Sequence, residues 1–431
     1  MRKLIKITLL TLIPFFGFTQ SWDRVYGGNE FDMGLSVQQT ADSGYVISGV
    51  TESFGNGNKD AWLLKTNVLG DTIWSNTFGG SNKDYFLSVK ETVDEGFILS
   101  GFTKSFGNGD EDMWLVKTNS QGNEEWSKTF GGSYKDYSNE VLQTNDGGYL
   151  LVGYTESFGS GQTDVWVVKT NSLGIEEWNK TYGGSGSDIG YSVDQTTDDG
   201  FIITGKNSSL GSISGDIWLL KIDEFGVEDW NQSFGGTMPD IGYSVKQTVD
   251  GGYILAGMSG GSSGPFGIII KTDSQGNSTW IKYHGLYGYD YFFSVEQTTD
   301  NGYIVVGETS SFGAGSYDVW LLKFNEQGDT VWSKTFGGSE DEYGSCVSQT
   351  TDGGFIISGM IKSFDNSNGN LWLIKTDYTG YLTEVVNVSN SESKELSKIV
   401  NLFGQETKPT KNTPLLYQYD DGTVEKKIII E

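Results

Sequence analysis

The sequence predicts an all-β protein in which seven similar sheets form a closed ring. Seven tryptophans recur at intervals of about 52 residues, and each opens a copy of one motif. The chain is rich in glycine (61 residues) and aromatic residues (14%) but has only 5 prolines, as expected for short strands joined by tight turns. An internal period of this size, with several strand-like runs per copy, is typical of a β-propeller. The tryptophans are Trp22, Trp74, Trp126, Trp178, Trp230, Trp280 and Trp332.

The second copy illustrates the four strands that are expected in each blade. The expected strands are Tyr85 to Thr92, Phe97 to Thr103, Met113 to Thr118, and a fourth through Trp126 to Phe130. In the third copy, the Asp146-Gly147-Gly148 turn supplies the positive backbone torsions that a short hairpin needs. The following run, from Tyr149 to Val152, is continuously apolar, which indicates a strand covered on both faces by neighbouring blades.

The two ends of the repeat region predict how the ring closes. The region begins with a lone fourth strand, Ser21 to Tyr26, and its last copy stops after a third strand, Leu371 to Thr376. Pairing these two strands completes a seventh blade and removes two exposed sheet edges. An open solenoid would instead carry polar caps at both ends. We therefore predict a seven-bladed propeller over residues 20–380, closed by exchange of the N-terminal strand.

Residues 1–19 are expected to be a secretory signal peptide. Basic Arg2 and Lys3 precede an apolar run from Leu4 to Phe18, and we expect cleavage before Gln20. The sequence has no other apolar stretch of about 20 residues, so no transmembrane segment is predicted. The net charge of -27 disfavours nucleic acid and anionic membranes as partners, and leaves divalent cations and basic or neutral ligands.

The chain offers few residues for catalysis. Cys346 is the only cysteine, so no intramolecular disulfide can form. It replaces serines such as Ser88 of other copies, which predicts a small buried residue rather than a nucleophile. His284, the only histidine, stands where other copies have Phe78 or Phe130 and is expected to be packed. We predict no catalytic residues, although the many carboxylates leave a carbohydrate-cleaving site open.

Glycine-rich loops and two series of carboxylates recur from copy to copy. Loops such as Ser105-Phe106-Gly107 and Gly131-Gly132-Ser133 are expected on one face, either as tight turns or as the lining of a ligand funnel. The carboxylates are expected to brace backbone N–H groups. No copy has the spacing of a dedicated calcium loop, so no cofactor is predicted. Calcium binding by the carboxylates is the alternative. The two series are Asp32, Asp84, Asp136, Asp188, Asp240, Asp290 and Glu342, and Asp60, Asp112, Asp164, Asp216 and Asp318.

One candidate ligand site comes from a departure from the repeat. The fifth copy has Gly267-Ile268-Ile269 in place of Asp-x-Trp, and its preceding loop is short. The next connection between blades carries Tyr287, Tyr289 and Asp290, with two tyrosines that the other copies lack. Exposed tyrosines beside a carboxylate suit a sugar or a peptide. We predict these three residues as a ligand site, and drift within a single copy is the alternative explanation.

The spacing from Gly122 to Trp126, which recurs in the other copies, resembles the tryptophan-docking repeat of quinoprotein-type propellers. This resemblance implies a tryptophan wedged between adjacent blades. It does not carry the cofactor over, because Thr118 and Leu115 replace the aspartate and alanine of that repeat. The full consensus, Trp-x3-Phe-Gly-Gly, Asp-Gly-Gly-Tyr and Asp-x-Trp, is similar to repeats in exported proteins of Bacteroidota.

After residue 380 the repeats end, and residues 381–397 are expected to form a linker rich in serine, asparagine and glutamate. Residues 398–431 resemble the C-terminal part of the sorting domain of type IX secretion substrates. This implies export through the type IX machinery. Physically, this segment is predicted as a small β-sandwich-like or hairpin module, with strands at Leu415 to Tyr419 and Thr423 to Ile430. The residues that carry the resemblance include Gly404, Lys408, Pro409, Asp421, Gly422, Lys426 and Lys427.

These observations predict a secreted or cell-surface binding protein that is not an enzyme and that takes a glycan or peptide ligand through one face. An extracellular enzyme is the alternative, either carbohydrate-active or a quinone-using oxidoreductase. A purely structural surface protein is a third interpretation. The repeated motif does not choose between them, because a propeller is a scaffold whose chemistry lies in its loops.

Overall fold

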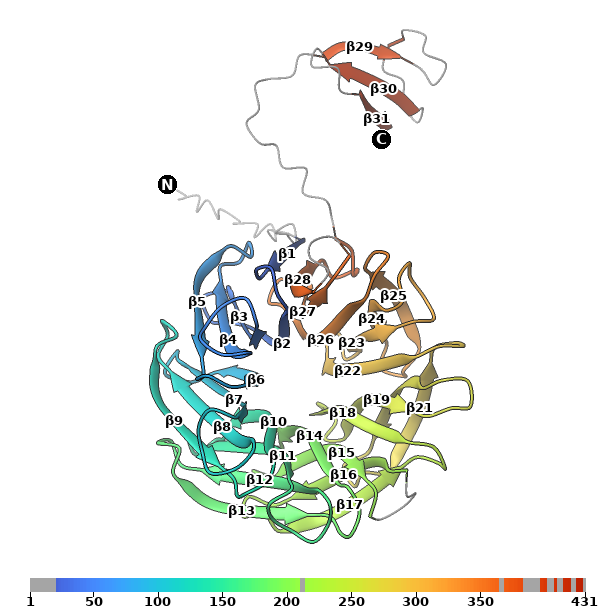
Figure 1. Ribbon diagram of the computed structural model, residues 1–431. Coiled ribbons are helices and arrows are strands. Elements are labelled where there is room, and N and C mark those ends of the chain that lie inside the picture. The colour runs from blue at the N-terminus through green and yellow to red at the C-terminus, as the bar shows by residue number, and fades with distance from the viewer. Residues whose placement is uncertain are drawn as a thin grey trace, which may run out of the picture. The chain divides into compact units, whose positions relative to one another are not determined.

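The computed structural model describes residues 21–209, 214–363 and 368–382, and the segments 396–400, 407–408, 414–419 and 424–428. The chain divides into two compact units, Met1–Thr383 and Glu384–Glu431. In the first unit, seven four-stranded antiparallel sheets surround a central axis as the blades of a propeller (Figure 1). This confirms the predicted fold class. The predicted signal peptide lies outside the described residues.

The blades follow one another along the chain, and each runs from an inner strand at the axis to an outer strand. Blade 1 contains β2 (Asp32–Gln39), β3 (Tyr45–Thr51), β4 (Asp60–Thr66) and β5 (Thr72–Phe78). Blade 2 contains β6 (Asp84–Glu91), β7 (Phe97–Thr103), β8 (Asp112–Thr118) and β9 (Glu124–Phe130). Blade 3 contains β10 (Asp136–Gln143), β11 (Tyr149–Thr155), β12 (Asp164–Thr170) and β13 (Glu176–Tyr182).

The remaining blades have the same order. Blade 4 contains β14 (Ile189–Gln195), β15 (Phe201–Asn207), β16 (Asp216–Ile222) and β17 (Glu228–Phe234). Blade 5 contains β18 (Asp240–Gln247), β19 (Tyr253–Ser259), β20 (Phe266–Thr272) and β21 (Ser278–His284). Blade 6 contains β22 (Asp290–Gln297), β23 (Tyr303–Thr309), β24 (Asp318–Phe324) and β25 (Thr330–Phe336). Blade 7 contains β26 (Glu342–Gln349), β27 (Phe355–Ile361), β28 (Asn370–Thr376) and β1 (Trp22–Tyr26).

The N-terminal strand closes the ring as the sequence predicts. β1 pairs antiparallel with β28, so that Trp22 lies opposite Lys375 and Tyr26 lies opposite Leu371. β1 is therefore the outermost strand of blade 7, and the two ends of the repeat region cover each other's exposed edges.

Tryptophan and glycine join each blade to the next. The indole of Trp74 in blade 1 lies against Gly122 in the β8–β9 turn of blade 2, where a Cβ would lie 2.6 Å from the ring. Gly122 also has a φ of +73°, a conformation that glycine adopts without steric cost. The same contact recurs in the pairs Trp22 and Gly70, Trp126 and Gly174, Trp178 and Gly226, Trp230 and Gly276, Trp280 and Gly328, and Trp332 and Gly380. The expected wedging of tryptophan between blades is thus observed.

A β-bulge in the innermost strand of every blade shapes the central channel. In blade 3 the register between β10 and β11 shifts between Ser138 and Glu140, so Asn139 is the extra residue. Gly153 lies opposite the bulge, and a Cβ there would lie 1.8 Å from the carbonyl oxygen of Tyr137. In the other blades, the extra residue at the equivalent bulge is Leu35, Leu87, Tyr191, Tyr243, Phe293 or Ser345. Each bulge directs one additional side chain into the channel lining.

The second unit contains a three-stranded antiparallel sheet in the order β29-β30-β31. Its strands are β29 (Leu396–Val400), β30 (Pro414–Tyr419) and β31 (Val424–Ile428). The hairpin expected from the sequence corresponds to β30 and β31, and β29 adds a strand that the sequence did not predict. Among the residues predicted as a sorting signal, Lys426 and Lys427 lie in β31 and Lys408 follows β29, whereas Gly404, Pro409, Asp421 and Gly422 lie outside the described residues.

Candidate functional site

The loops between second and third strands and the connections between blades lie together on one face, which we call the loop face. The hydroxyl of Ser105, in the β7–β8 loop, accepts a hydrogen bond from the backbone N–H of Asn82, in the β5–β6 connection, over 3.1 Å. Lys59 and Lys83 form an isolated parallel bridge between the same two kinds of loop. Gly107 has a φ of +96°, so this repeated glycine serves turn geometry. Ligand contacts of these loops stay a prediction.

Both recurring series of carboxylates brace these loops. Asp84 accepts hydrogen bonds from the Ser105 hydroxyl (2.6 Å) and from the backbone N–H of Gly80 (2.9 Å). In the second series, Asp112 accepts from the backbone N–H of Gly109 over 3.0 Å. The predicted structural role is confirmed for these residues. Within the described ranges, no group of three or more histidine, cysteine, aspartate or glutamate side chains is placed to hold a metal ion, and the calcium alternative stays a prediction.

The three residues predicted as a ligand site differ in their accessibility. Tyr287 is 91% exposed and Tyr289 is 52% exposed, both in the β21–β22 connection on the loop face. Asp290 is fully buried, and its carboxylate accepts hydrogen bonds from Thr309 and Ser311. Its carboxylate therefore anchors the loop in the way that Asp84 does in blade 2. Only the two tyrosines present side chains to solvent, and their contact with a ligand stays a prediction.

The departures in blade 5 accompany a cavity of about 440 Å³ that is lined by the β17–β18 connection and by strands of blade 5. The register places Ile268 where other copies have the tryptophan, so Phe266-Gly267-Ile268, one residue earlier than the sequence suggested, replaces Asp-x-Trp. Ile268 lines the cavity together with Met238 and Tyr283. Met238 is 45% exposed and Tyr283 is 59% exposed, so the cavity has an apolar rim. The shortened loop and the lost indole are consistent with this opening.

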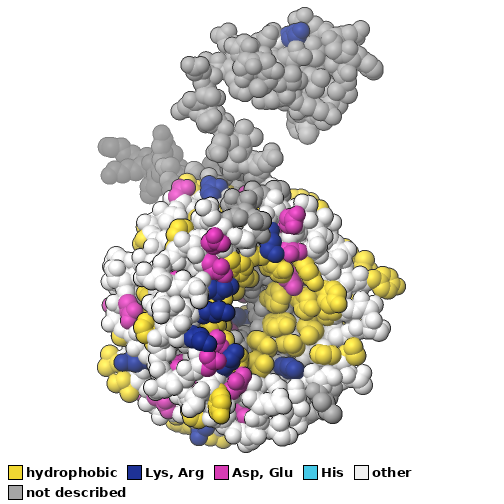
Figure 2. All heavy atoms as spheres, in the orientation of Figure 1, with side chains coloured by type: hydrophobic (Ala, Val, Ile, Leu, Met, Phe, Trp, Pro, Cys, Tyr) yellow, Lys and Arg dark blue, Asp and Glu magenta, His cyan; other side chains and the backbone are white. Residues whose placement is uncertain are grey.

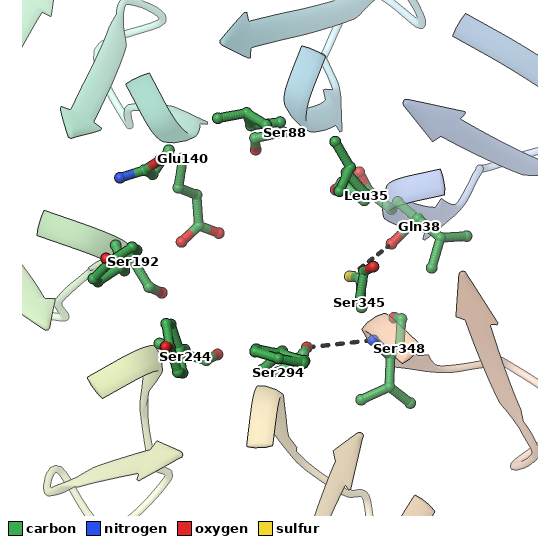
Figure 3. Close-up of a pocket in the computed structure, with 18 of the residues that line it drawn as sticks. Leu35, Gln38, Ser88, Glu140, Ser192, Ser244, Ser294, Ser345 and Ser348 are labelled. Carbon is green, nitrogen blue, oxygen red and sulfur yellow. Dashed lines mark hydrogen bonds between the residues drawn. The ribbon is translucent and has the colours of Figure 1, made fainter. Parts of the chain in front are cut away.

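A second cavity, of about 240 Å³, lies in the central channel, where the inner strands of all seven blades converge (Figure 3). Five blades place a serine hydroxyl in its wall, and each hydroxyl accepts a hydrogen bond from a valine N–H of the next blade. These serines are Ser36, Ser88, Ser192, Ser244 and Ser294. Blades 3 and 7 have Glu140 and Cys346 at this position instead. The channel wall is therefore polar and joins blade to blade.

Charged side chains of both signs face this cavity. The carboxylate of Glu140 lies 3.4 Å from the ammonium of Lys90 and 3.6 Å from that of Lys246. Burial acts to raise the pKa of Glu140, but the attraction of Lys246 and Lys90 outweighs it and holds this pKa at about 2. Burial raises the pKa of Glu296, which also lines the cavity. The channel can therefore offer both donors and acceptors to a polar group.

Aromatic side chains form an arc from the channel wall to the loop face, which we call the aromatic arc. Its members are Tyr191, Tyr243, Phe293, Tyr291, Tyr317 and Tyr343. The ring centroids of Tyr191 and Tyr243 are 5.1 Å apart, and those of Tyr243 and Phe293 are 5.2 Å apart. All six are partly exposed. Figure 2 shows hydrophobic side chains along one side of the central opening, over β18 to β26, and charged side chains on the other side.

A carboxylate lies among the rings of the arc. Glu308 is the register partner of Tyr291, so the two side chains share one face of blade 6. It is 7% exposed, and its Oε2 atom is buried without a hydrogen-bond partner. Burial, with a smaller contribution from Asp341, raises the pKa of Glu308 to about 8. An unpartnered buried carboxylate with a raised pKa is characteristic of functional sites.

The two residues considered for catalysis, His284 and Cys346, both contact other parts of the propeller. His284 lies 4.9 Å from the ring of Phe324 and 5.9 Å from that of Phe292, between ring centroids, and burial lowers its pKa. The thiol of Cys346 donates a weak hydrogen bond to the carbonyl oxygen of Val37 over 3.7 Å, and burial raises its pKa. These contacts confirm the packing predicted for His284, whereas Cys346 is only partly buried and lines the central cavity. Among the described residues, no helix has the length and apolarity needed to cross a bilayer.

Sequence analysis missed the residues of the channel and Glu308. The sequence did contain an indication of both residues. When the seven copies are aligned, Glu140 stands at a position that is serine in five other copies, and Glu308 at a position that is Phe102 or Tyr154 in two others. The repeat consensus hid it, because strand periodicity does not reveal which residue of an inner strand is bulged towards the axis.

No protein-family model matches this chain, and no curated protein matches it. Among solved structures, it is similar to Sqt1 of Chaetomium thermophilum bound to the N-terminus of ribosomal protein L10 (9% identity, 82% of this chain and 98% of that chain, TM-score 0.47). It is also similar to a protein of unknown function from Dyadobacter fermentans (12%, 82% and 97%, 0.44) and to YCF48 bound to a D1 peptide (12%, 86% and 97%, 0.48). At these identities the similarity concerns the fold alone.

Proposed function

We propose that this protein is a non-catalytic binding protein that captures a peptide or glycan ligand on the loop face, at the aromatic arc. The observation that carries the proposal is an arc of six partly exposed rings, three of which, Tyr191, Tyr243 and Phe293, line the polar cavity. Aromatic surface with a few polar groups beside it is the usual composition of a ligand site. Tyrosine supplies both a flat apolar face and a hydroxyl, so it suits chains that carry alternating apolar and polar groups.

The charge of the protein narrows the ligand. A net charge of -27 repels polyanions and favours neutral or basic ligands. The lysines on the loop face do not offset this, since several are paired within the chain. Lys59 contacts Glu52 over 2.8 Å, and Lys362 contacts Asp341 over 3.0 Å. A neutral glycan or a basic peptide segment therefore fits the surface better than an acidic one.

We further propose that the protein is exported to the cell surface or released. Support comes from the sequence, in which residues 1–19 have the pattern of a signal peptide and residues 398–431 resemble a type IX sorting domain. A test is to express the full chain, and a chain ending at Thr383, in a bacterium that has a type IX system. We expect the full chain at the surface or in the medium, beginning at Gln20, and the truncated chain in the periplasm. Equal export of both chains would contradict the sorting role.

The binding role is tested by screening the full chain against peptide and polysaccharide arrays and measuring the affinity of each ligand found. A Tyr243→Ala, Phe293→Ala double variant is expected to weaken binding at least tenfold, because both rings belong to the arc. Tyr378→Ala is the matched control, since Tyr378 is 66% exposed in a turn on the opposite face. A Tyr287→Ala, Tyr289→Ala variant tests the connection that the sequence singled out.

Two results would contradict the binding role. Unchanged affinity in the Tyr243→Ala, Phe293→Ala variant would remove the arc as the site. Release of product from any ligand in the panel, abolished by replacing a loop-face carboxylate, would instead favour the enzyme alternative.

A further inference from the structure

The slot that Glu308 occupies is filled by an aromatic ring in two other blades, by Phe102 in blade 2 and by Tyr154 in blade 3. In blade 2, Phe102 has the equivalent position, and its ring centroid lies 4.7 Å from that of Tyr85 and 4.2 Å from that of Tyr137. The residues equivalent to these two tyrosines are Tyr291 and Tyr343. In blade 6 a carboxylate therefore replaces a phenyl ring between two tyrosines, and it is too small to fill the same volume.

Other carboxylates on the loop face are satisfied by lysines of the chain itself. In blade 1 the ammonium of Lys59 contacts Glu52 over 2.8 Å and lies 4.5 Å from the ring centroid of Phe31. In blade 2, Glu111 accepts a hydrogen bond from Tyr137 and lies 3.3 Å from the ammonium of Lys135. The chain thus builds internal cation sites from a carboxylate and aromatic rings on this face.

Blade 6 has the rings and the carboxylate of such a site but supplies no cation. Tyr317 occupies the position that Lys59 has in blade 1. Lys362, in the β27–β28 loop of the neighbouring blade, is paired with Asp341 over 3.0 Å. Within the described residues, Glu308 has neither an ion pair nor a hydrogen bond to its buried Oε2 atom. The negative charge of a buried carboxylate is costly unless a cation compensates it.

We propose that Glu308, with Tyr291, Tyr317 and Tyr343, forms a site for an organic cation, the alkylammonium or guanidinium group of a ligand. We call these four residues the Glu308 cage. The faces of tyrosine rings attract cations, and the carboxylate beneath them adds a charge partner. The net charge of -27 favours the approach of a cation. This inference rests on the proposed function, because it names the chemical group that the aromatic arc would recognise.

The proton of Glu308 makes the proposal testable in a specific way. Burial raises the pKa of this carboxyl to about 8, so the uncharged form dominates at neutral pH in the free protein. A cation binds the charged form better, so binding is coupled to loss of one proton. The charged and titratable groups that face Glu308 are Asp341, which is paired with Lys362, and the hydroxyls of Tyr243, Tyr291, Tyr317 and Tyr343. The pKa values of these tyrosines are all raised, so Glu308 is the group of the site that titrates near neutrality.

The experiment uses the full chain and ligand-observed NMR titration. Choline and tetramethylammonium are probes with a permanent charge, and 3,3-dimethylbutan-1-ol is the uncharged analogue of choline. Choline is expected to bind at least tenfold more tightly than the alcohol, and its affinity is expected to rise about tenfold or more from pH 6.5 to pH 9. Amides of lysine and arginine, free and within a peptide, distinguish a small amine from a basic side chain as the natural source of the cation.

Variants separate the cage from general charge effects. Glu308→Gln is expected to abolish the preference for choline and its pH dependence, and Tyr317→Leu is expected to weaken choline binding severalfold. Glu111→Gln is the matched control on the same face, because its carboxylate already has Lys135 as partner, and it is expected to leave choline affinity unchanged. If Glu308→Gln does not fold, the cage is still tested by the choline affinity of Tyr317→Leu and by the ratio of the affinities of the parent protein for choline and for the alcohol.

Equal affinity for choline and the alcohol, or full choline affinity in Glu308→Gln, would overturn the cage. That failure is distinguishable from failure of the proposed function. A peptide or glycan that binds the arc while choline does not would leave the binding role intact. Choline binding in a protein that takes no peptide or glycan would leave the cage intact and remove those ligand classes.

Discussion

The indole nitrogen of Trp372, in the last propeller strand, donates a hydrogen bond over 3.1 Å to the carboxylate of Asp23, in the first. The two residues are 349 positions apart, so this contact belongs to the closure of the ring. Closure also depends on Trp22, which is 8% exposed and donates from its indole to the carbonyl oxygen of Val68 in blade 1. The N-terminal strand therefore belongs to blade 7 by pairing and contacts blade 1 by packing.

Replacing Trp22 with alanine tests the closure. The change removes a buried indole and its contact with Gly70, and large aromatic truncations in a core cost about 3 to 5 kcal/mol. We expect the free energy of unfolding, measured by guanidinium titration, to fall by that amount. Tyr378→Ala, at an exposed position, is the control and should change it little. A Trp22→Ala protein as stable as the parent would show that β1 does not close the ring.

Glycines opposite the bulges are predicted to tolerate no side chain. A Cβ on Gly153 would lie 1.8 Å from the carbonyl oxygen of Tyr137, so Gly153→Ala must displace the bulge that carries Asn139. We expect a loss of about 3 kcal/mol or more, seen as a lower midpoint in thermal unfolding. Gly236→Ala is the matched control, because a Cβ there meets nothing within 4 Å. Similar losses for the two variants would contradict a steric role of the bulge.

The sequence predicted the fold because the fold is set by features that repeat. The tryptophans, the apolar second and third strands and the turn glycines recur in every copy, and the structure places them as expected. Second strand β7 (Phe97–Thr103) has the predicted bounds, and third strand β8 (Asp112–Thr118) begins one residue early. Pattern reasoning succeeds where the same constraint acts seven times.

The candidate site was harder to predict because it depends on residues that break the repeat. Glu140 stands at an aligned position that is serine in five other blades and Cys346 in one, and Glu308 stands at a mostly apolar aligned position that is Lys206 in blade 4. Their significance depends on a bulge and on packing between blades, which are tertiary features. Sequence reasoning chose Asp290 as the carboxylate beside the exposed tyrosines, but the structure places its carboxylate in loop contacts and places Glu308 beside the register position of Tyr291.

The charge cluster in the channel predicts acid sensitivity. The folded pKa of Glu140 is about 2, below the ordinary value of 4.5. Its stabilising contribution is therefore complete above pH 4.5 and is lost as the pH falls towards 2. Glu140→Gln is expected to lower the free energy of unfolding by about 3 kcal/mol at pH 7 and to match the parent near pH 2. Urea titrations across this pH range measure the difference, and Glu224→Gln, at an exposed position, serves as control. A constant difference from pH 7 to pH 2 would contradict the role of Lys90 and Lys246.

The stability of Glu308 variants should depend on pH in the opposite sense. The folded pKa of Glu308 is about 8, above the ordinary 4.5, so the folded state favours the protonated carboxyl. Below pH 4.5, Glu308 therefore does not lower the free energy of unfolding of the parent protein. This free energy falls as the pH rises through 8, because the buried carboxyl must then ionise. Glu308→Gln mimics the protonated form, and we expect it to match the parent at pH 4.5 and to exceed it by about 3 to 5 kcal/mol at pH 9.

Differential scanning calorimetry of both proteins between pH 4.5 and pH 9 measures this divergence. Glu111→Gln is again the control, since its carboxylate has a lysine partner at 3.3 Å. Adding tetramethylammonium at pH 9 should stabilise the parent and leave Glu308→Gln unchanged, because a ligand stabilises only the protein that binds it. Parallel stability curves for the parent and Glu308→Gln would show that the carboxylate is already compensated in the folded protein, and the cage would then have no need of an external cation.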